Sequence, residues 1–442
     1  MKLWDKGTPV NQRVEQFTVG RDREMDKMLA KADILGSLAH IAMLNSIGLI
    51  ADDELKLLSA ALKDIYKNHL TDFTIEPGVE DVHSQIELML TRKLGDVGKK
   101  IHSGRSRNDQ VLVDIKIFAR EQIREIHDLI LTLFETLVAL SEKHKNVLIP
   151  GYTHLQIAMP SSFGLWFGAY AESLTDDLLM LQTAYRITNQ NPLGSAAGYG
   201  SSFPLNRTMT TKLLGFETLN FNVIYAQMNR GKTEKTISFA LSSIAATLAK
   251  MSMDICLFMS QNFSFVSFPD ELTTGSSIMP HKKNPDVFEL IRAKGNRIQA
   301  LPNEISMMLT NLTSGYHRDF QLLKEILFPA MEDMKAMLDI ANMMLQNIRV
   351  KDDILKDEKY KYIFSVEEVN RLVLKGVPFR DAYKQVGGQI AEGKFNPSLT
   401  VKHTHEGSIG NLCNENIRKK MQNISEGFCF ANVDKALQHL LQ

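Results

Sequence analysis

The sequence predicts an all-α protein organised around a bundle of long helices. Apolar residues recur at steps of three and four in five segments, which cover about 112–140, 167–185, 237–258, 287–312 and 323–348. This spacing is typical of amphipathic helices, and roughly 30 residues would make each helix ~45 Å long. The apolar seams stay close to a heptad repeat, which favours packing at shallow angles. Because no region alternates strand and helix, a sheet-based nucleotide-binding fold is not expected.

Signals at the ends of these segments support the helices. Asn108 or Asp109 is a natural N-cap for the first long helix, and Pro150 with Gly151 closes that segment. Pro302 predicts a bend in the fourth helix. Helices this long, with apolar faces this wide, are hard to cover within one protomer. We therefore expect an oligomer whose core is a shared bundle.

Three regions of the chain differ in pattern. Residues 1–106 carry short helical patterns and predict an N-terminal helical domain. Residues 107–357 hold the long helices and the loops between them, and predict the part that oligomerises and carries the active-site loops. Residues 358–442 weaken into shorter helices and polar turns, and predict a small C-terminal helical domain.

Composition narrows the class of protein. The formal net charge is +0, so the broad basic surface of a nucleic-acid or membrane binder is not expected. The N-terminus lacks an apolar segment, and Lys250 and Asp254 interrupt the most apolar stretch, so neither a secretory signal nor a membrane span is predicted. The three cysteines show no metal-ligand spacing and fit a reducing cytosol: Cys256, Cys413 and Cys429. A soluble cytoplasmic protein is expected.

Residues 273–286 form the segment richest in chemical groups. Ser276 and its neighbour supply hydroxyls and consecutive N–H donors, and residues 281–283 add two or three cations before Asn284. Pro280 and Pro285 exclude a regular helix or central strand here. Such a loop can hold a carboxylate or phosphate by charge-assisted hydrogen bonds. The alternative is a solvated basic turn between two helices.

Three further loops carry polar side chains between predicted helices. Residues 101–110 precede a long helix and would meet its positive end, which is an anion site. Residues 151–156 contain His154, although a lone histidine is more often structural than catalytic, and residues 316–324 form the last loop. Metal-site and phosphate-loop motifs are missing from the sequence, so neither a metal nor a nucleotide cofactor is predicted.

Taken together, these segments resemble the fumarase/aspartase superfamily, and within it the argininosuccinate lyase family. Residues 275–285 read GSSIMPHKKNP and match the superfamily motif GSSxMPxKxNP in full. Residues 102–110 read HSGRSRNDQ, close to the HTGRSRNDQ of argininosuccinate lyases. Residues 150–156 and 375–380 also read like that family, and the likeness runs from about 10 to about 390.

The resemblance implies a β-elimination that converts argininosuccinate to arginine and fumarate, as the last step of arginine biosynthesis, with no metal or organic cofactor. It makes Ser276 and His154 the pair that moves the protons. Ser276, activated by Lys282, is assigned as the base and His154 as the group that protonates the leaving nitrogen, and the reverse assignment is the alternative. It also implies a homotetramer whose active sites combine segments of several protomers. The positions that would hold the substrate are Arg107, Asn108, Thr153, Lys282, Asn284, Tyr316, Gln321 and Lys324.

Three places depart from the family pattern. Gly20 replaces a usual serine, residues 229–232 read NRGK where SERD is common, and Leu322 and Leu323 stand where acidic residues are common. These departures motivate one alternative, a related fumarate-releasing carbon–nitrogen lyase acting on a modified amine. A separate alternative is a non-catalytic structural homologue, against which the intact Ser276, His154 and Lys282 argue. Adenylosuccinate lyase is disfavoured, because residues 104–110 resemble the argininosuccinate branch.

Overall fold

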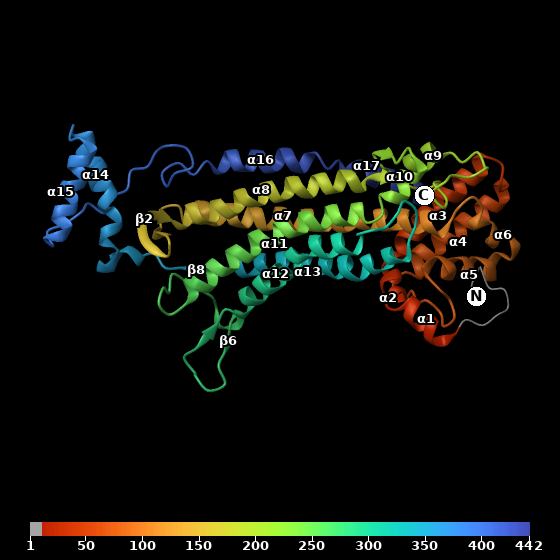
Figure 1. Cartoon of the computed structure of the whole chain (residues 1–442), viewed down its shortest axis with the longest axis horizontal. Coiled ribbons are helices and arrows are strands. Elements are labelled where there is room, and N and C mark those ends of the chain that lie inside the picture. Colours follow the sequence, from red (N-terminus) through yellow and green to blue (C-terminus); the bar gives the residue numbers. More distant parts are fainter. Residues whose placement is uncertain (1–10) are drawn as a thin grey trace.

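The computed structural model describes residues 11–442 and confirms the predicted all-α class. Five long helices run side by side through the molecule (Figure 1). They are α7 (Arg107–Lys143), α8 (Phe163–Thr188), α11 (Lys232–Met259), α12 (Asp286–Met308) and α13 (Leu322–Gln346). Their apolar faces form one large core that buries most of the predicted seams, and a smaller cluster holds Ile305 of α12 and Leu323 of α13. The apolar periodicity of the sequence therefore identified the helix faces that pack together in the bundle.

The longest helix, α7, begins with a capping box. The Ser106 hydroxyl accepts a hydrogen bond from the Asn108 N–H at 3.2 Å, and the Asp109 carboxylate accepts one from the Ser106 N–H at 2.9 Å. The predicted N-cap, Asn108 or Asp109, was therefore wrong by two or three residues. Ser106 takes that place because its hydroxyl and Asp109 satisfy free N–H groups reciprocally. Asn108 consequently lies in the first turn.

Six short helices gather at the end of the bundle where α7 begins (Figure 1). They are α1 (Gln12–Val19), α2 (Asp22–Asp26), α3 (Ala30–Ser46), α4 (Asp52–Asn68), α5 (Val82–Leu94) and α6 (Asp96–Lys99). The α3 helix is buried almost all round and packs against α7. This contact fixes the N-terminal helices against the start of α7.

The structure adds an antiparallel hairpin of β1 (Leu148–Thr153) and β2 (Gln156–Ser162). The sequence interpretation placed an irregular loop at residues 151–156, which was wrong. His154 and Leu155 form the tip with φ of 54° and 59°, as a two-residue hairpin turn requires. The remaining strands have two residues each: β3 (Gln190–Asn191), β4 (Thr218–Leu219), β5 (Val266–Ser267), β6 (Thr274–Gly275), β7 (Lys283–Asn284) and β8 (Arg349–Val350). The β6–β7 pair closes the base of the 273–286 loop.

The C-terminal helices fall into two places. The α14 helix (Ser365–Leu374) and α15 (Phe379–Ala391) share a small core of their own at one end of the molecule (Figure 1). The α16 helix (Asn414–Glu426) lies along α8, and α17 (Phe430–Leu441) packs against α3 and α9 (Arg207–Leu213). How the chain divides into independently folding domains stays a prediction.

Of the described helices, α11 is long and apolar enough to cross a membrane by length and composition alone. In its most apolar window 56% of the residues are buried inside the protein, where α11 packs against α8 and α12. The core helix of a bundle passes the same test. We therefore read α11 as a core element.

Candidate active site

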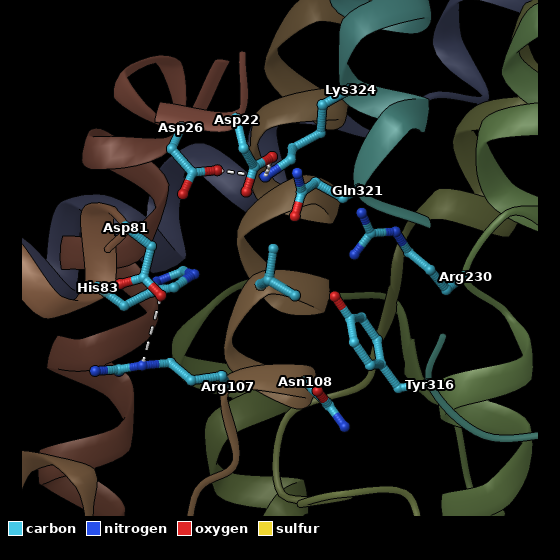
Figure 2. Close-up of a pocket in the computed structure, with 11 residues that line it drawn as sticks. Asp22, Asp26, Asp81, His83, Arg107, Asn108, Arg230, Tyr316, Gln321 and Lys324 are labelled. Carbon is cyan, nitrogen blue, oxygen red and sulfur yellow. Dashed lines mark hydrogen bonds and ion pairs between the residues drawn. The ribbon is translucent and has the colours of Figure 1, made fainter. Parts of the chain in front are cut away.

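A cavity of about 80 Å³ opens where α7 meets the N-terminal helices and the start of α13 (Figure 2). Its lining comes from segments that lie far apart in the sequence. The lining residues are Asp22, Asp26, Asp81, His83, Arg107, Asn108, Val111, Arg230, Tyr316, Gln321 and Lys324. Ten of these eleven can form hydrogen bonds or carry charge, so the cavity suits a polar ligand.

The first turn of α7 forms one wall. Arg107 is the first residue of α7, and Asn108 follows it, so both lie at the positive end of a long helix. Arg107 is held by Glu87 at 3.0 Å and Asp81 at 3.9 Å. Burial opposes ionisation of Asp81, but His83 and Arg107 outweigh it and hold the pKa of Asp81 below its usual range. The guanidinium is thus oriented before any ligand arrives.

A charge cluster forms the opposite wall. Lys324 of α13 is 4% exposed, and its ammonium lies 2.6 Å from the Asp22 carboxylate and also bonds Asp26. Burial lowers the pKa of Lys324, but the two carboxylates more than reverse this effect and raise the pKa. Burial, followed by the charge of Asp26, raises the pKa of Asp22 to about 6. Above about pH 6, where Asp22 is ionised, two carboxylates surround one ammonium, so the group of Asp22, Asp26 and Lys324 carries a net negative charge.

Two side chains join α1 and α11 to this wall. The Gln321 amide donates hydrogen bonds to the carbonyl oxygens of Thr18 and Val19, at 3.1 and 3.2 Å. Arg230 pairs with Glu234 at 2.8 Å and donates to the Phe320 carbonyl at 2.9 Å. The position of Gln321 is therefore tied to the end of α1.

Five of the predicted site residues come together here: Arg107, Asn108, Tyr316, Gln321 and Lys324. Figure 2 shows Tyr316 and Asn108 on one side of the cavity and Lys324 and Gln321 on the other. Lys324 and Gln321 already have protein partners. If these two side chains bind substrate as predicted, they would do so while also bonded to their protein partners.

The other five predicted residues lie elsewhere in the protomer. Thr153 and His154 are exposed at the turn of the β1–β2 hairpin. Ser276, Lys282 and Asn284 belong to the β6–β7 loop. Figure 1 shows both segments toward the opposite end of the bundle from the N-terminal helices. A single protomer does not bring these residues to the cavity.

Several lining residues had no place in the predicted set. Asp81 caps α5 and His83 lies in its first turn, so this helix start brings both side chains to the cavity. Asp22 and Asp26 carry no local signal, because their partner Lys324 is about 300 residues away. Arg230 lies inside residues 229–232, one of the three places where the sequence differs from the family pattern.

Comparisons with known proteins identify the family of this chain. A protein-family model described as lyase matches residues 6–300. The argininosuccinate lyase of Bacteroides thetaiotaomicron is 63% identical over 441 residues, which cover 100% of this chain and 99% of the relative. That of Thermotoga neapolitana is 40% identical over 396 residues, covering 89% and 99%. The chain belongs to the argininosuccinate lyase family. It is a carbon–nitrogen lyase of the fumarase/aspartase superfamily.

Solved structures share the fold. A variant of EDDS lyase with bound fumarate superposes with a TM-score of 0.77 at 20% identity, covering 98% of this chain and 95% of that chain. A fumarate lyase:delta crystallin from Brucella melitensis bound to cobalt gives 0.72 at 16% identity, covering 94% and 91%. At this level of identity the likeness concerns the fold alone.

The three departures from the family pattern lie near the Lys324 wall. Gly20 ends α1 with a φ of 50°, two residues before Asp22. Gly231 precedes α11 with a φ of 81°, next to Arg230. Leu322 is half exposed, whereas Leu323 is buried beside Phe320. The departures therefore surround the wall that holds Gln321 and Lys324.

Proposed function

We propose that this protein cleaves argininosuccinate into L-arginine and fumarate by β-elimination without a metal or organic cofactor. The observation that carries the proposal is the meeting of five family substrate positions from distant segments at one polar cavity, in a chain 63% identical to a named argininosuccinate lyase. The reaction serves arginine biosynthesis. The enzyme is proposed to be soluble and cytoplasmic, with no nucleic-acid or membrane partner.

The two walls suit the two halves of this substrate. The succinyl carboxylates are anions, and Arg107 and Asn108 at the start of α7 offer a cation and a helix N-terminus. Thr153, Lys282 and Asn284 would add donors from other protomers. The guanidino half would lie toward Tyr316, Gln321 and the Lys324 wall. The surplus carboxylate there favours a cationic group.

The complete active site requires more than one protomer. The loops bearing His154 and Ser276 lie toward the opposite end of the bundle from the N-terminal helices (Figure 1), and neither residue lines the cavity. We infer a homotetramer, formed through the long helices, in which loops of neighbouring protomers close each cavity. Symmetric oligomers repeat the same interfaces, so each tetramer would hold four equivalent sites.

The roles proposed for these loops in the reaction come from the family resemblance. Ser276, as the base, would take the proton from the carbon beside a carboxylate. The electron pair left on that carbon would form the fumarate double bond while the carbon–nitrogen bond breaks. His154 would protonate the leaving nitrogen. The Ser276 hydroxyl oxygen accepts hydrogen bonds from the Met279 and Ile278 N–H groups, at 3.1 and 3.4 Å, and these donors support negative charge on the oxygen.

Fumarate release measured by ultraviolet absorbance tests the proposal. Argininosuccinate, adenylosuccinate and aspartate are supplied in parallel to the purified enzyme. Release of fumarate and arginine from argininosuccinate alone is expected. A second candidate, a lyase for a modified amine, is motivated by the departures around the Lys324 wall. It would be favoured if a folded tetramer released nothing from all three substrates.

A further inference from the structure

A buried acid–base cluster lies directly behind the cavity. It consists of His83 on α5, Asp33 on α3 and Asp114 on α7, and we call it the Asp33–His83–Asp114 cluster. The three residues are 3%, 1% and 0% exposed. His83 also lines the cavity (Figure 2). Its ring contacts the buried carboxylates of Asp33 and Asp114 and therefore connects them to the ligand space.

One ring nitrogen faces both carboxylates. His83 Nδ1 lies 2.8 Å from Asp33 Oδ1 and 3.3 Å from Asp114 Oδ2. The amide of Gln110 donates to the same Asp33 oxygen at 2.7 Å. Because an ionised carboxylate only accepts hydrogen bonds, Nδ1 must carry a proton. Among residues 11–442, no hydrogen-bond partner is found for Nε2, which leaves this nitrogen for a ligand in the cavity.

The two carboxyl groups differ in charge. Burial opposes ionisation of Asp33, but His83, Arg105 and Gln110 outweigh it and hold the pKa of Asp33 far below its usual range. Burial first, and then the charge of Asp33, raise the pKa of Asp114 well above its usual range, with Asp26 acting in the same direction and Arg105 opposing. Two carboxyls this close do not both ionise. Asp33 is thus the charged member and Asp114 the protonated one.

We propose that Asp33 is a positioning residue that acts through His83. It fixes the ring and its tautomer, so that Nε2 meets the substrate. Asp114 supplies a neutral carboxyl that packs against His83 and Asp33. This inference rests on the proposed elimination, since it assigns His83 a contact with that substrate. No proton needs to pass along the cluster, because Nδ1 keeps its proton throughout.

The same three side chains are residue types that could ligate a metal. The 2.8 Å contact between Nδ1 and Asp33 is, however, a hydrogen-bond distance, and Arg105 already offsets the carboxylate charge. The test therefore also measures bound metal, and a metal ion held by these three side chains would overturn the proposal.

The test compares Asp33→Asn with Asp114→Asn, two identical changes in one cluster. An amide at 33 lacks the charge and can present an N–H to the ring, which favours the wrong tautomer. In a Ser–His–Asp triad the equivalent change lowers kcat about 10⁴-fold. We expect Asp33→Asn to lower kcat at least about 100-fold with KM changed less than about threefold. Asp114→Asn, which replaces a neutral group by a neutral group, should keep kcat within about threefold.

A double-mutant cycle separates positioning from folding. If Asp33 acts through His83, adding Asp33→Asn to His83→Asn should lower kcat no further. The proposal would be overturned if Asp33→Asn lowered kcat equally in the parent and in the His83→Asn background. It would also be overturned if Asp33→Asn and Asp114→Asn lowered kcat equally. Should Asp33→Asn fail to fold, Gln110→Met replaces it in the cycle. That change removes the donor that orients Asp33, and it should likewise have no added effect in the His83→Asn background.

Solid-state ¹⁵N NMR of histidine-labelled enzyme reads the tautomer without turnover. The His83 signal, assigned by its loss in His83→Asn, should show a proton on Nδ1 in the parent enzyme and on Nε2 in Asp33→Asn. An unprotonated Nδ1 in the parent, or one metal ion per protomer that Asp33→Asn removes, would contradict the proposal. Because this readout needs no substrate, it separates failure of the cluster from failure of the proposed function. An inactive parent enzyme with the expected tautomer would contradict only the function.

Discussion

The ammonium of Lys324 on α13 lies 2.6 Å from the carboxylate of Asp22 on α2, with Asp26 bonded to the same ammonium. Lys324 and Asp26 are 4% and 2% exposed, so this contact joins the N-terminal helices to the bundle inside the protein. The same contact forms one wall of the cavity. The proposed substrate binding would therefore share one group of charges with the contact that stabilises the fold.

Lys324→Met should be strongly destabilising. Removing one partner of a buried ion pair leaves an uncompensated charge, which costs about 3–5 kcal/mol. Lys335→Met on the same helix is the matched control, because its pairs with Glu125 and Glu332 lie nearer the surface and should be worth about 1 kcal/mol or less. Urea unfolding at one fixed protein concentration measures both. Equal costs would show that the Lys324 contact contributes little.

Asp22 should make stability depend on pH. Its pKa is raised to about 6 in the folded protein, mainly by burial, against about 3.9 in an unfolded chain. A pKa that is raised on folding contributes to the free energy of unfolding. This contribution is fully present below the pKa of the unfolded chain and is lost as pH rises through the pKa of the folded protein. Asp22→Asn cannot ionise, so its melting temperature minus that of the parent should increase from pH 4 to pH 7. A constant difference over this range would exclude a raised pKa at Asp22.

Ser276→Ala and His154→Asn should each reduce kcat by about 10²-fold or more, since both residues are proposed to move protons. The melting temperature should stay near that of the parent. In the protomer His154 is exposed, and the Ser276 hydroxyl accepts hydrogen bonds from the Ile278 and Met279 N–H groups of its own loop. Full activity in either variant would remove that residue from the mechanism.

Gln321→Ala should raise KM for argininosuccinate about tenfold while kcat changes little, as expected when a group binds ground state and transition state alike. The loss includes the two hydrogen bonds that tie Gln321 to Thr18 and Val19. Gln321→Glu separates the causes, because it keeps the size of the side chain but cannot donate to those carbonyls. An unchanged KM in both variants would put Gln321 outside the site.

The fold was largely predictable because helical periodicity is local. The seams of α7, α8, α11, α12 and α13 appear in the sequence at three- and four-residue steps, and the helices formed there. The β1–β2 hairpin was missed because its segment contains Pro150, Gly151 and Pro160, which signal loops and turns more strongly than strands. Ser106 was overlooked as the cap because Asn108 and Asp109 also carry capping side chains.

The site was predictable only in part. Arg107 and Asn108 are adjacent in a motif at a helix start, so sequence alone places them. Asp22 and Asp26 gain their role from Lys324, and no local pattern reveals a partner that distant. Neither Ser276 nor His154 lines the cavity of its own protomer, so their proposed assembly with it would depend on contacts between chains.

Subunit mixing tests the central claim, an argininosuccinate-cleaving site shared between protomers, most directly. Arg107→Gln impairs the cavity and Ser276→Ala impairs the loop, so each tetramer alone should be inactive. After the two variants are dissociated together and reassembled, random mixing should give each site an intact cavity and an intact loop in about one quarter of cases. We predict that fumarate release from argininosuccinate returns to about that fraction of the parent rate. No recovery, with mixed tetramers demonstrated, would contradict a site built from different protomers.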